Sequence, residues 1–177
     1  MNILDSERIQ VFISYAHHDN NDPNPSKRWL DRLKEHLAPL VLQNLVDAWS
    51  DQDIAMGEDW HQQIQTRLAA AKVAVLLISP AFLASTYIRN SELPVLLQKA
   101  KEQGTVIISI ILRPCLFAET TFNYPDPIQG PEQLSLASLQ ASNSPTEALS
   151  GLDEHRQDQV LLAVARRILQ LVQPFNP

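Results

Sequence analysis

The chain reads Ile9-Gln10-Val11-Phe12-Ile13-Ser14-Tyr15-Ala16 near its start and then turns polar, with His17-His18-Asp19-Asn20-Asn21-Asp22. The first segment is apolar and rich in β-branched and aromatic residues, which predicts a buried strand. The second segment predicts a loop at the carboxyl end of that strand. Because open α/β sheets bind ligands at the carboxyl edge, this junction is the first candidate for a functional site.

The remaining chain alternates predicted strands with predicted helices. Residues 73–78 and 105–112 are continuous apolar runs, typical of strands covered on both faces, and 45–49 predicts a shorter strand. The helical spacing of apolar residues predicts helices over 25–39, from 59 to beyond 68, over 92–102 and over 153–173. The alternation predicts an α/β, flavodoxin-like fold of three layers, with a parallel sheet in the order 2-1-3-4-5 between helices. We also expect a short edge strand at 134–136.

The composition is that of one globular domain. The 177 residues are 45% hydrophobic and 19% charged, which suits a single core. We expect residues 1–173 to form this domain and 174–177 to begin a linker toward a further, C-terminal domain. The net charge of −6 argues against direct binding to nucleic acid or to an anionic membrane, because both need a basic surface.

Several classes of site are excluded by the residue types present. The one cysteine, Cys115, allows neither an internal disulfide nor a cysteine-rich metal site, and the four glycines are too scattered for a phosphate-binding loop. His17 and His18 lack a third ligand at metal spacing, so no metal is expected. The N-terminus lacks a signal-peptide pattern, and no apolar run approaches the roughly 18–20 residues of a membrane span. We therefore expect a cytoplasmic protein.

Glu92 is the carboxylate of greatest interest. It follows the apolar run at 73–78 within the next strand–helix unit, so it can meet the loop after the first strand at the same edge of the sheet. Taken alone, it also suits a solvated position at the start of a helix, where negative charge is mildly favourable. The local sequence favours that second interpretation, and only the surrounding motifs reverse it.

Three segments carry these motifs, in order along the chain. The first is the opening strand at 11–16, and the second is 49–60, which reads Trp-Ser-Asp-Gln-Asp-Ile-Ala-Met-Gly-Glu-Asp-Trp. The third runs from 73–79 through Phe82 and Ser85 to Glu92-Leu93-Pro94, and Arg113-Pro114-Cys115 follows the next predicted strand. This ordered set resembles the bacterial Toll/interleukin receptor (TIR) domain family. The second segment is similar to the family's BB loop, D-x-x-I-x-x-G-x-x-W, and the third to the segment bearing its catalytic glutamate.

The resemblance implies cleavage of the nicotinamide–ribose bond of NAD⁺, giving ADP-ribose or a cyclic ADP-ribose. Glu92 is then the catalytic residue, and NAD⁺ is a substrate, so no cofactor is expected. One carboxylate is chemically sufficient. The nicotinamide ring of NAD⁺ is already cationic, so it can leave without a general acid, and the carboxylate stabilises the oxocarbenium-like centre that forms on the ribose. The residues expected to bind the substrate are Ser14, Tyr15, His17, Trp49 and Tyr87.

The resemblance also implies partners. TIR domains self-associate through the BB loop, here 50–58, and head-to-tail contacts of this kind build open filaments. A sensor or oligomerisation domain in a longer protein would trigger this assembly, in antiphage defence or cell-death signalling. The residues expected to carry self-association are Asp51, Asp53, Ile54 and Gly57.

Two positions depart from the family pattern. Ile88 stands where many catalytic members have a tryptophan, with Tyr87 beside it as another aromatic face, and Gln52 stands where bacterial relatives often carry a basic residue. The departure at Ile88 favours an alternative function, a non-catalytic module that signals by TIR–TIR association. A third interpretation is a different flavodoxin-like nucleotide enzyme, such as a deoxyribosyltransferase.

Overall fold

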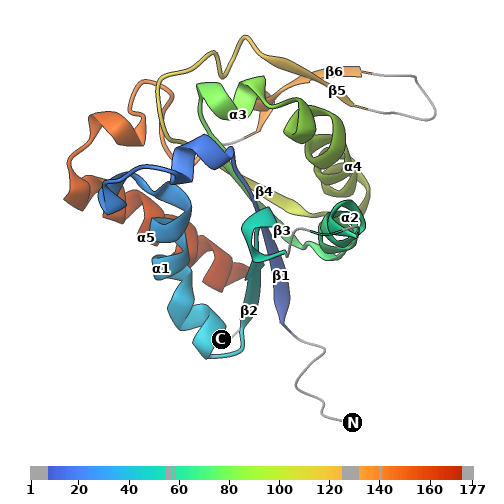
Figure 1. Ribbon diagram of the computed structural model, residues 1–177, viewed down its shortest axis with the longest axis horizontal. Helices are drawn as coiled ribbons and strands as arrows, with labels where there is room; N and C mark the ends of the chain where they lie inside the picture. Colours follow the sequence, from blue (N-terminus) through green and yellow to red (C-terminus); the bar gives the residue numbers. More distant parts are fainter. Residues whose placement is uncertain (1–7, 55–56, 58, 125–131, 140, 173–177) are drawn as a thin grey trace.

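The computed structural model describes residues 8–54, 57, 59–124, 132–139 and 141–172. Its centre is a parallel sheet of four strands with helices on both sides (Figure 1). The spatial order is β2-β1-β3-β4, which confirms the predicted parallel sheet and the first four positions of the predicted order. The strands are β1 (Ile9–Ser14), β2 (Val46–Trp49), β3 (Val73–Ile78) and β4 (Val106–Ile111).

Five α-helices in the described residues cover the two faces of this sheet. α1 and α5 lie on one face, and α2, α3 and α4 lie on the other (Figure 1). Their bounds are α1 (Trp29–Leu42), α2 (Trp60–Ala70), α3 (Pro80–Ala84), α4 (Leu93–Gln103) and α5 (Glu154–Val172). α1 continues past Pro39, where we expected it to end, to Leu42, and the proline removes only the one hydrogen bond that its own N–H would donate.

Side chains of β1 alternate between the two cores. Phe12 belongs to the cluster under α2, α3 and α4, whereas Val11 and Ile13 belong to the cluster under α1 and α5. This alternation is the ordinary period of a strand. It directs Ser14 toward the α4 face, and Tyr15, just after the strand, belongs to the core cluster of the α1 face. The carboxyl end of β1 therefore presents a different side chain to each face.

The edge beyond β4 differs from the prediction. The strand expected at 134–136 lies instead in a separate antiparallel sheet, where β6 (Glu132–Ser135) pairs with β5 (Thr121–Tyr124). Beside β4, an isolated parallel bridge joins Ser109 to Ala141. The side chain of Asn143 then accepts a hydrogen bond from the Ile111 N–H and donates one to its C=O, both at 2.9 Å. A side-chain amide thus satisfies the β4 backbone where a fifth strand was predicted.

Some predictions fall outside the described residues. The expected linker at 174–177 does, as do residues 55–56 and 58 of the expected self-association loop. Among the described helices, none is long and apolar enough to cross a membrane.

Candidate active site

Glu92 is buried at the carboxyl edge of the sheet, where β1 and β3 end. Its Oε2 accepts a hydrogen bond of 2.6 Å from the hydroxyl of Ser14, the last residue of β1. The two residues are 3% and 1% exposed. β1 and β3 are neighbours in the sheet although β2 lies between them in the sequence, so the chain reverses its order here. Ligands of doubly wound sheets bind at this kind of switch point.

A π-helical turn, η5 (Ile88–Glu92), places the carboxyl group. It follows α3, whose first turn is capped by Ser79, where Oγ accepts a hydrogen bond of 3.0 Å from the Phe82 N–H. η5 then runs directly into α4. π-helical turns are frequent at functional sites, because the extra residue reorients the side chains around it. The periodicity of the sequence did not predict this turn.

The surroundings raise the pKa of Glu92 to about 7. Burial is the largest cause, because it penalises the charged carboxylate, and the negative charge of Asp51 acts in the same direction. The hydrogen bond from Ser14 and the neighbouring His17 oppose the shift. Near neutral pH the group is therefore about half ionised. Carboxyl groups shifted in this way are concentrated at functional sites.

Tyr15 and His17 form a second group with Asp51, which comes from the loop after β2. The Nε2 of His17 lies 2.5 Å from the Oδ2 of Asp51, and the rings of Tyr15 and His17 are 5.3 Å apart. Burial, followed by the charge of Asp51, raises the pKa of Tyr15. The Oδ1 of Asp51 is buried and has no hydrogen-bond partner among the described residues. Asp51, which we expected only in self-association, therefore belongs to the same polar region as Glu92.

Tyr87, predicted to bind the substrate, lies close enough to Glu92 to feel its charge. Burial and then the charge of Glu92 raise the pKa of Tyr87 to about 12. Its ring stands 5.1 Å from the ring of Trp60, and its hydroxyl lies 3.3 Å from the Nδ1 of His61. The neighbouring Ile88, at the position where many family members have tryptophan, is 3% exposed and part of the core.

Trp49 lies at the carboxyl end of β2, opposite Phe12 in the parallel pairing. The guanidinium of Arg67, on α2, stacks over its ring at 3.4 Å from the centroid. The indole Nε1 is buried without a hydrogen-bond partner among the residues that the structure describes. Within the part of the chain that the structure describes, Trp49 has no hydrogen bond or ring contact with Glu92, and Arg67, which covers it, carried no signal in the sequence.

Hydrogen bonds, an ion pair and core packing hold the described part of the loop after β2 against the rest of the domain. Asp53 accepts hydrogen bonds from the backbone and side chain of Ser50 and is paired with Lys34 at 2.8 Å. Ile54 is 6% exposed and lies in the core cluster of α2 and α4. Gly57 is exposed, and a Cβ added there would meet no atom within 4 Å. Of the four residues expected to carry self-association, Asp53 and Gly57 are exposed, whereas Ile54 is buried.

Comparison with known proteins assigns this sequence to a family. The family model described as TIR domain matches residues 11–152, a range that contains both Ser14 and Glu92. The chain belongs to the TIR domain family. This confirms the resemblance, and the family includes enzymes that cleave NAD⁺.

A relative of this TIR domain is an uncharacterized protein, y4lF, of Sinorhizobium fredii. The two are 31% identical over 105 residues, which is 59% of this chain and 30% of the relative. The match therefore spans less than a third of the relative's length. Within the described residues of the TIR domain itself, no cluster of His, Cys, Asp and Glu side chains suited to a metal ion is found.

Proposed function

We propose that this TIR domain cleaves NAD⁺ between nicotinamide and ribose, with Glu92 as the catalytic carboxylate. The observation that carries the proposal is a buried carboxyl group with a pKa of about 7, held by Ser14 at the switch point of the sheet. Burial of this carboxyl group does not stabilise the fold, because it penalises the ionised form of the group. Its position instead suits a ligand whose charge compensates it.

The proposed reaction needs one carboxylate. The bond between C1′ of the ribose and the pyridinium nitrogen breaks, and its electron pair leaves with nicotinamide, which becomes neutral. Positive charge develops on the ribose, and ionised Glu92 stabilises it. Water attacks C1′ and loses a proton, which gives ADP-ribose. Attack by a nitrogen of the adenine gives a cyclic ADP-ribose instead.

The raised pKa of Glu92 favours a cationic substrate. The site resists an isolated negative charge, and a pyridinium ring beside Glu92 would lower its pKa again. Binding of NAD⁺ would thus produce the carboxylate that the reaction requires. NADH, whose nicotinamide ring is neutral, provides no such charge and no cationic leaving group.

Self-association is common among TIR domains, and we include it in the proposal. Copies of this domain would assemble through the loop at 50–58, where Gly57 is exposed. A sensor or oligomerisation domain in a longer protein would control the assembly, in antiphage defence or cell-death signalling. If activity depends on assembly, the rate of nicotinamide release should rise more than proportionally with the protein concentration.

The burial of Ile88 favours a second candidate, a non-catalytic module that signals through TIR–TIR contacts. Ile88 is aliphatic and 3% exposed, so it offers the substrate no aromatic surface, and the ring of Tyr87 already packs against Trp60. This candidate predicts assembly without loss of NAD⁺. The two candidates therefore differ in one measurable product, nicotinamide.

The decisive experiment measures nicotinamide release from NAD⁺ over a range of protein concentrations, with and without a crowding agent. Glu92→Gln keeps the size of the side chain and should lower the rate at least about a hundredfold, as loss of a main electrostatic group does. Glu102→Gln, an exposed position on the same helical segment, is the matched control and should keep the rate. Absence of nicotinamide in folded, assembled wild-type protein would reject the glycohydrolase and favour the interaction module.

A further inference from the structure

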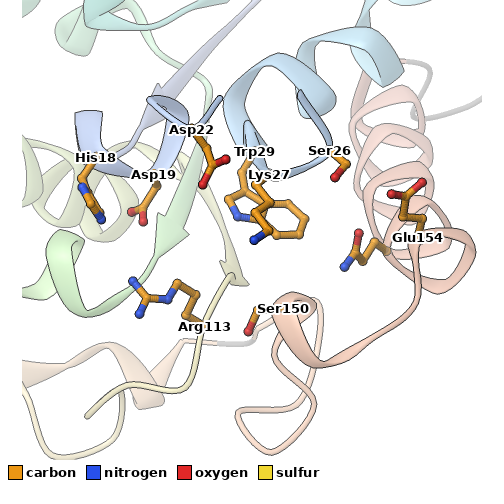
Figure 2. Close-up of a pocket in the computed structure, with 10 residues that line it drawn as sticks. His18, Asp19, Asp22, Ser26, Lys27, Trp29, Arg113, Ser150 and Glu154 are labelled. Carbon is orange, nitrogen blue, oxygen red and sulfur yellow. The ribbon is translucent and has the colours of Figure 1, made fainter. Parts of the chain in front are cut away.

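A polar cavity of about 480 Å³ lies beside the first residues of α1 and α5, and Glu92 is not among the residues that line it (Figure 2). Trp29, in its wall, belongs to the core cluster of α1 and α5, whereas Ile88 and Leu93, on either side of Glu92, belong to the cluster of α2 and α4. The cavity opens between the first residues of α1 and of α5. It is therefore a separate site at the same carboxyl edge of the sheet.

Hydrogen-bond donors converge on the middle of this cavity. Figure 2 shows Lys27 reaching in from one side, with Arg113 and Ser150 on the opposite side. Neither Lys27 nor Arg113 forms a side-chain hydrogen bond or an ion pair with a described residue. α1 and α5 also begin at the cavity, at Trp29 and Glu154, and the N-terminal end of a helix attracts negative charge. These groups together favour an anion.

Acceptors flank the donors. Asp19 is 5% exposed, and one of its oxygens, Oδ2, accepts a hydrogen bond from the Ser79 hydroxyl. The other oxygen has no hydrogen-bond partner among the described residues, and the side chain points into the cavity (Figure 2). Glu154 lines the far side from the first turn of α5. Asp22, a third carboxylate in the wall, accepts a hydrogen bond of 2.8 Å from the Asn24 N–H. A bare anion would leave the second oxygen of Asp19 and Glu154 without a donor, and a polyamine would face Lys27 and Arg113.

We propose that this cavity binds a small phosphorylated sugar, with its phosphate between Lys27 and Arg113 and its hydroxyls on Asp19 and Glu154. Arg113 and Lys27 supply charge-assisted hydrogen bonds to the phosphate oxygens. The sugar hydroxyls donate to the second oxygen of Asp19 and to Glu154. Binding here does not require cleavage of NAD⁺, so the site is independent of the proposed function.

The test is a titration of the protein with ribose 5-phosphate, followed by calorimetry and by amide chemical shifts. Lys27→Gln and Arg113→Gln should each weaken binding on the order of tenfold, since each removes one charge-assisted hydrogen bond. Lys72→Gln removes an exposed lysine outside the cavity and should leave binding unchanged. Glu92→Gln should also bind normally. Shifts are expected in 18–29 and around Ser150.

Three outcomes would overturn the proposal. The first is no saturable binding at millimolar ribose 5-phosphate. The second is equal affinity for inorganic phosphate, which would reduce the site to an adventitious anion contact. The third is binding that survives in the Lys27→Gln, Arg113→Gln double variant but is lost in Glu92→Gln, which would assign the ligand to the site of Glu92. A thermal melt of each variant verifies that it is folded.

Discussion

The hydroxyl of Ser14 donates a 2.6 Å hydrogen bond to Oε2 of Glu92, a residue 78 positions further along the chain. The bond fastens the end of β1 to the helical segment after β3. It also opposes the rise in the pKa of Glu92 that burial causes. A serine of a strand thus stabilises the ionised form of a carboxyl group in the turn before α4, against the effect of burial.

Replacing Ser14 with alanine should raise the pKa of Glu92 further, because the ionised form loses its donor. A smaller fraction of Glu92 is then ionised at neutral pH, so nicotinamide release should fall there and recover partly at higher pH. The measurement is the pH profile of kcat/KM for NAD⁺. Ser109→Ala is the matched control, since Ser109 is also buried in a strand but its Oγ has no hydrogen-bond partner in the described residues. An unchanged profile for Ser14→Ala would contradict the assigned contact.

Asp51→Asn should shift the same profile in the opposite direction. Removing the negative charge of Asp51 lowers the pKa of Glu92, so the acidic limb of the profile moves to lower pH. Asp53→Asn, two residues away, weakens the bonds to Ser50 and Lys34 and should cost about 1 kcal/mol of stability without moving the limb. Equal shifts in the two variants would show that loop structure, not the charge of Asp51, controls Glu92.

Glu92→Gln should make the protein more stable at pH 8 than the wild type. The pKa of Glu92 rises from 4.5 in the unfolded chain to about 7 in the folded protein, so the unfolded chain releases its proton at lower pH. Wild-type stability therefore falls as the pH rises from 4.5 through 7, by on the order of 3 kcal/mol in total. Urea unfolding at pH 5 and pH 8 measures this. A stability difference that does not grow with pH would refute the raised pKa.

Two changes in the loop after β2 should separate folding from assembly. Ile54→Ala removes a buried core side chain and should cost about 2–4 kcal/mol in urea unfolding. Gly57→Arg places a long side chain in open space, so stability should stay unchanged while assembly, followed by light scattering, weakens. If Gly57→Arg assembles like the wild type, the contact between copies lies elsewhere.

Ile88→Trp tests the departure from the family pattern. Ile88 is 3% exposed, so a tryptophan would overpack the core and cost about 1–3 kcal/mol without improving catalysis. Ile88→Leu is the control with similar volume. Faster nicotinamide release by a stable Ile88→Trp variant would show instead that this position can open toward the substrate.

The sheet was largely predictable because its strands are buried on both faces. β3 is a run of six apolar residues, and its predicted bounds, 73–78, agree with the structure. The fifth strand was predicted wrongly because a side chain, Asn143, took over hydrogen bonds that sequence patterns assign to a backbone. The periodicity of apolar residues indicates which residues are buried. It does not indicate which polar group makes the hydrogen bonds to the backbone of an edge strand.

The site was predictable in part. The motif order identified Glu92 and Ser14, and the structure joins them, but their roles in catalysis stay predictions. Asp51 was assigned to self-association because its segment resembles the family's BB loop, and the structure places its side chain beside Tyr15 and His17. Long-range pairs of this kind depend on the three-dimensional path of the loop, which local sequence does not encode. The cavity between Lys27 and Arg113 combines residues from separate elements for the same reason.

The π-helical turn at Ile88–Glu92 makes the position of the carboxyl group depend on how many residues precede it. An α-helix rotates by about 100° per residue, so deleting one residue, such as the exposed Asn90, would swing the carboxyl group away from Ser14 even with every functional side chain retained. Substitution scanning would not uncover this dependence. In relatives aligned to this segment, a one-residue gap before the glutamate would therefore signal a lost site more reliably than many replacements would.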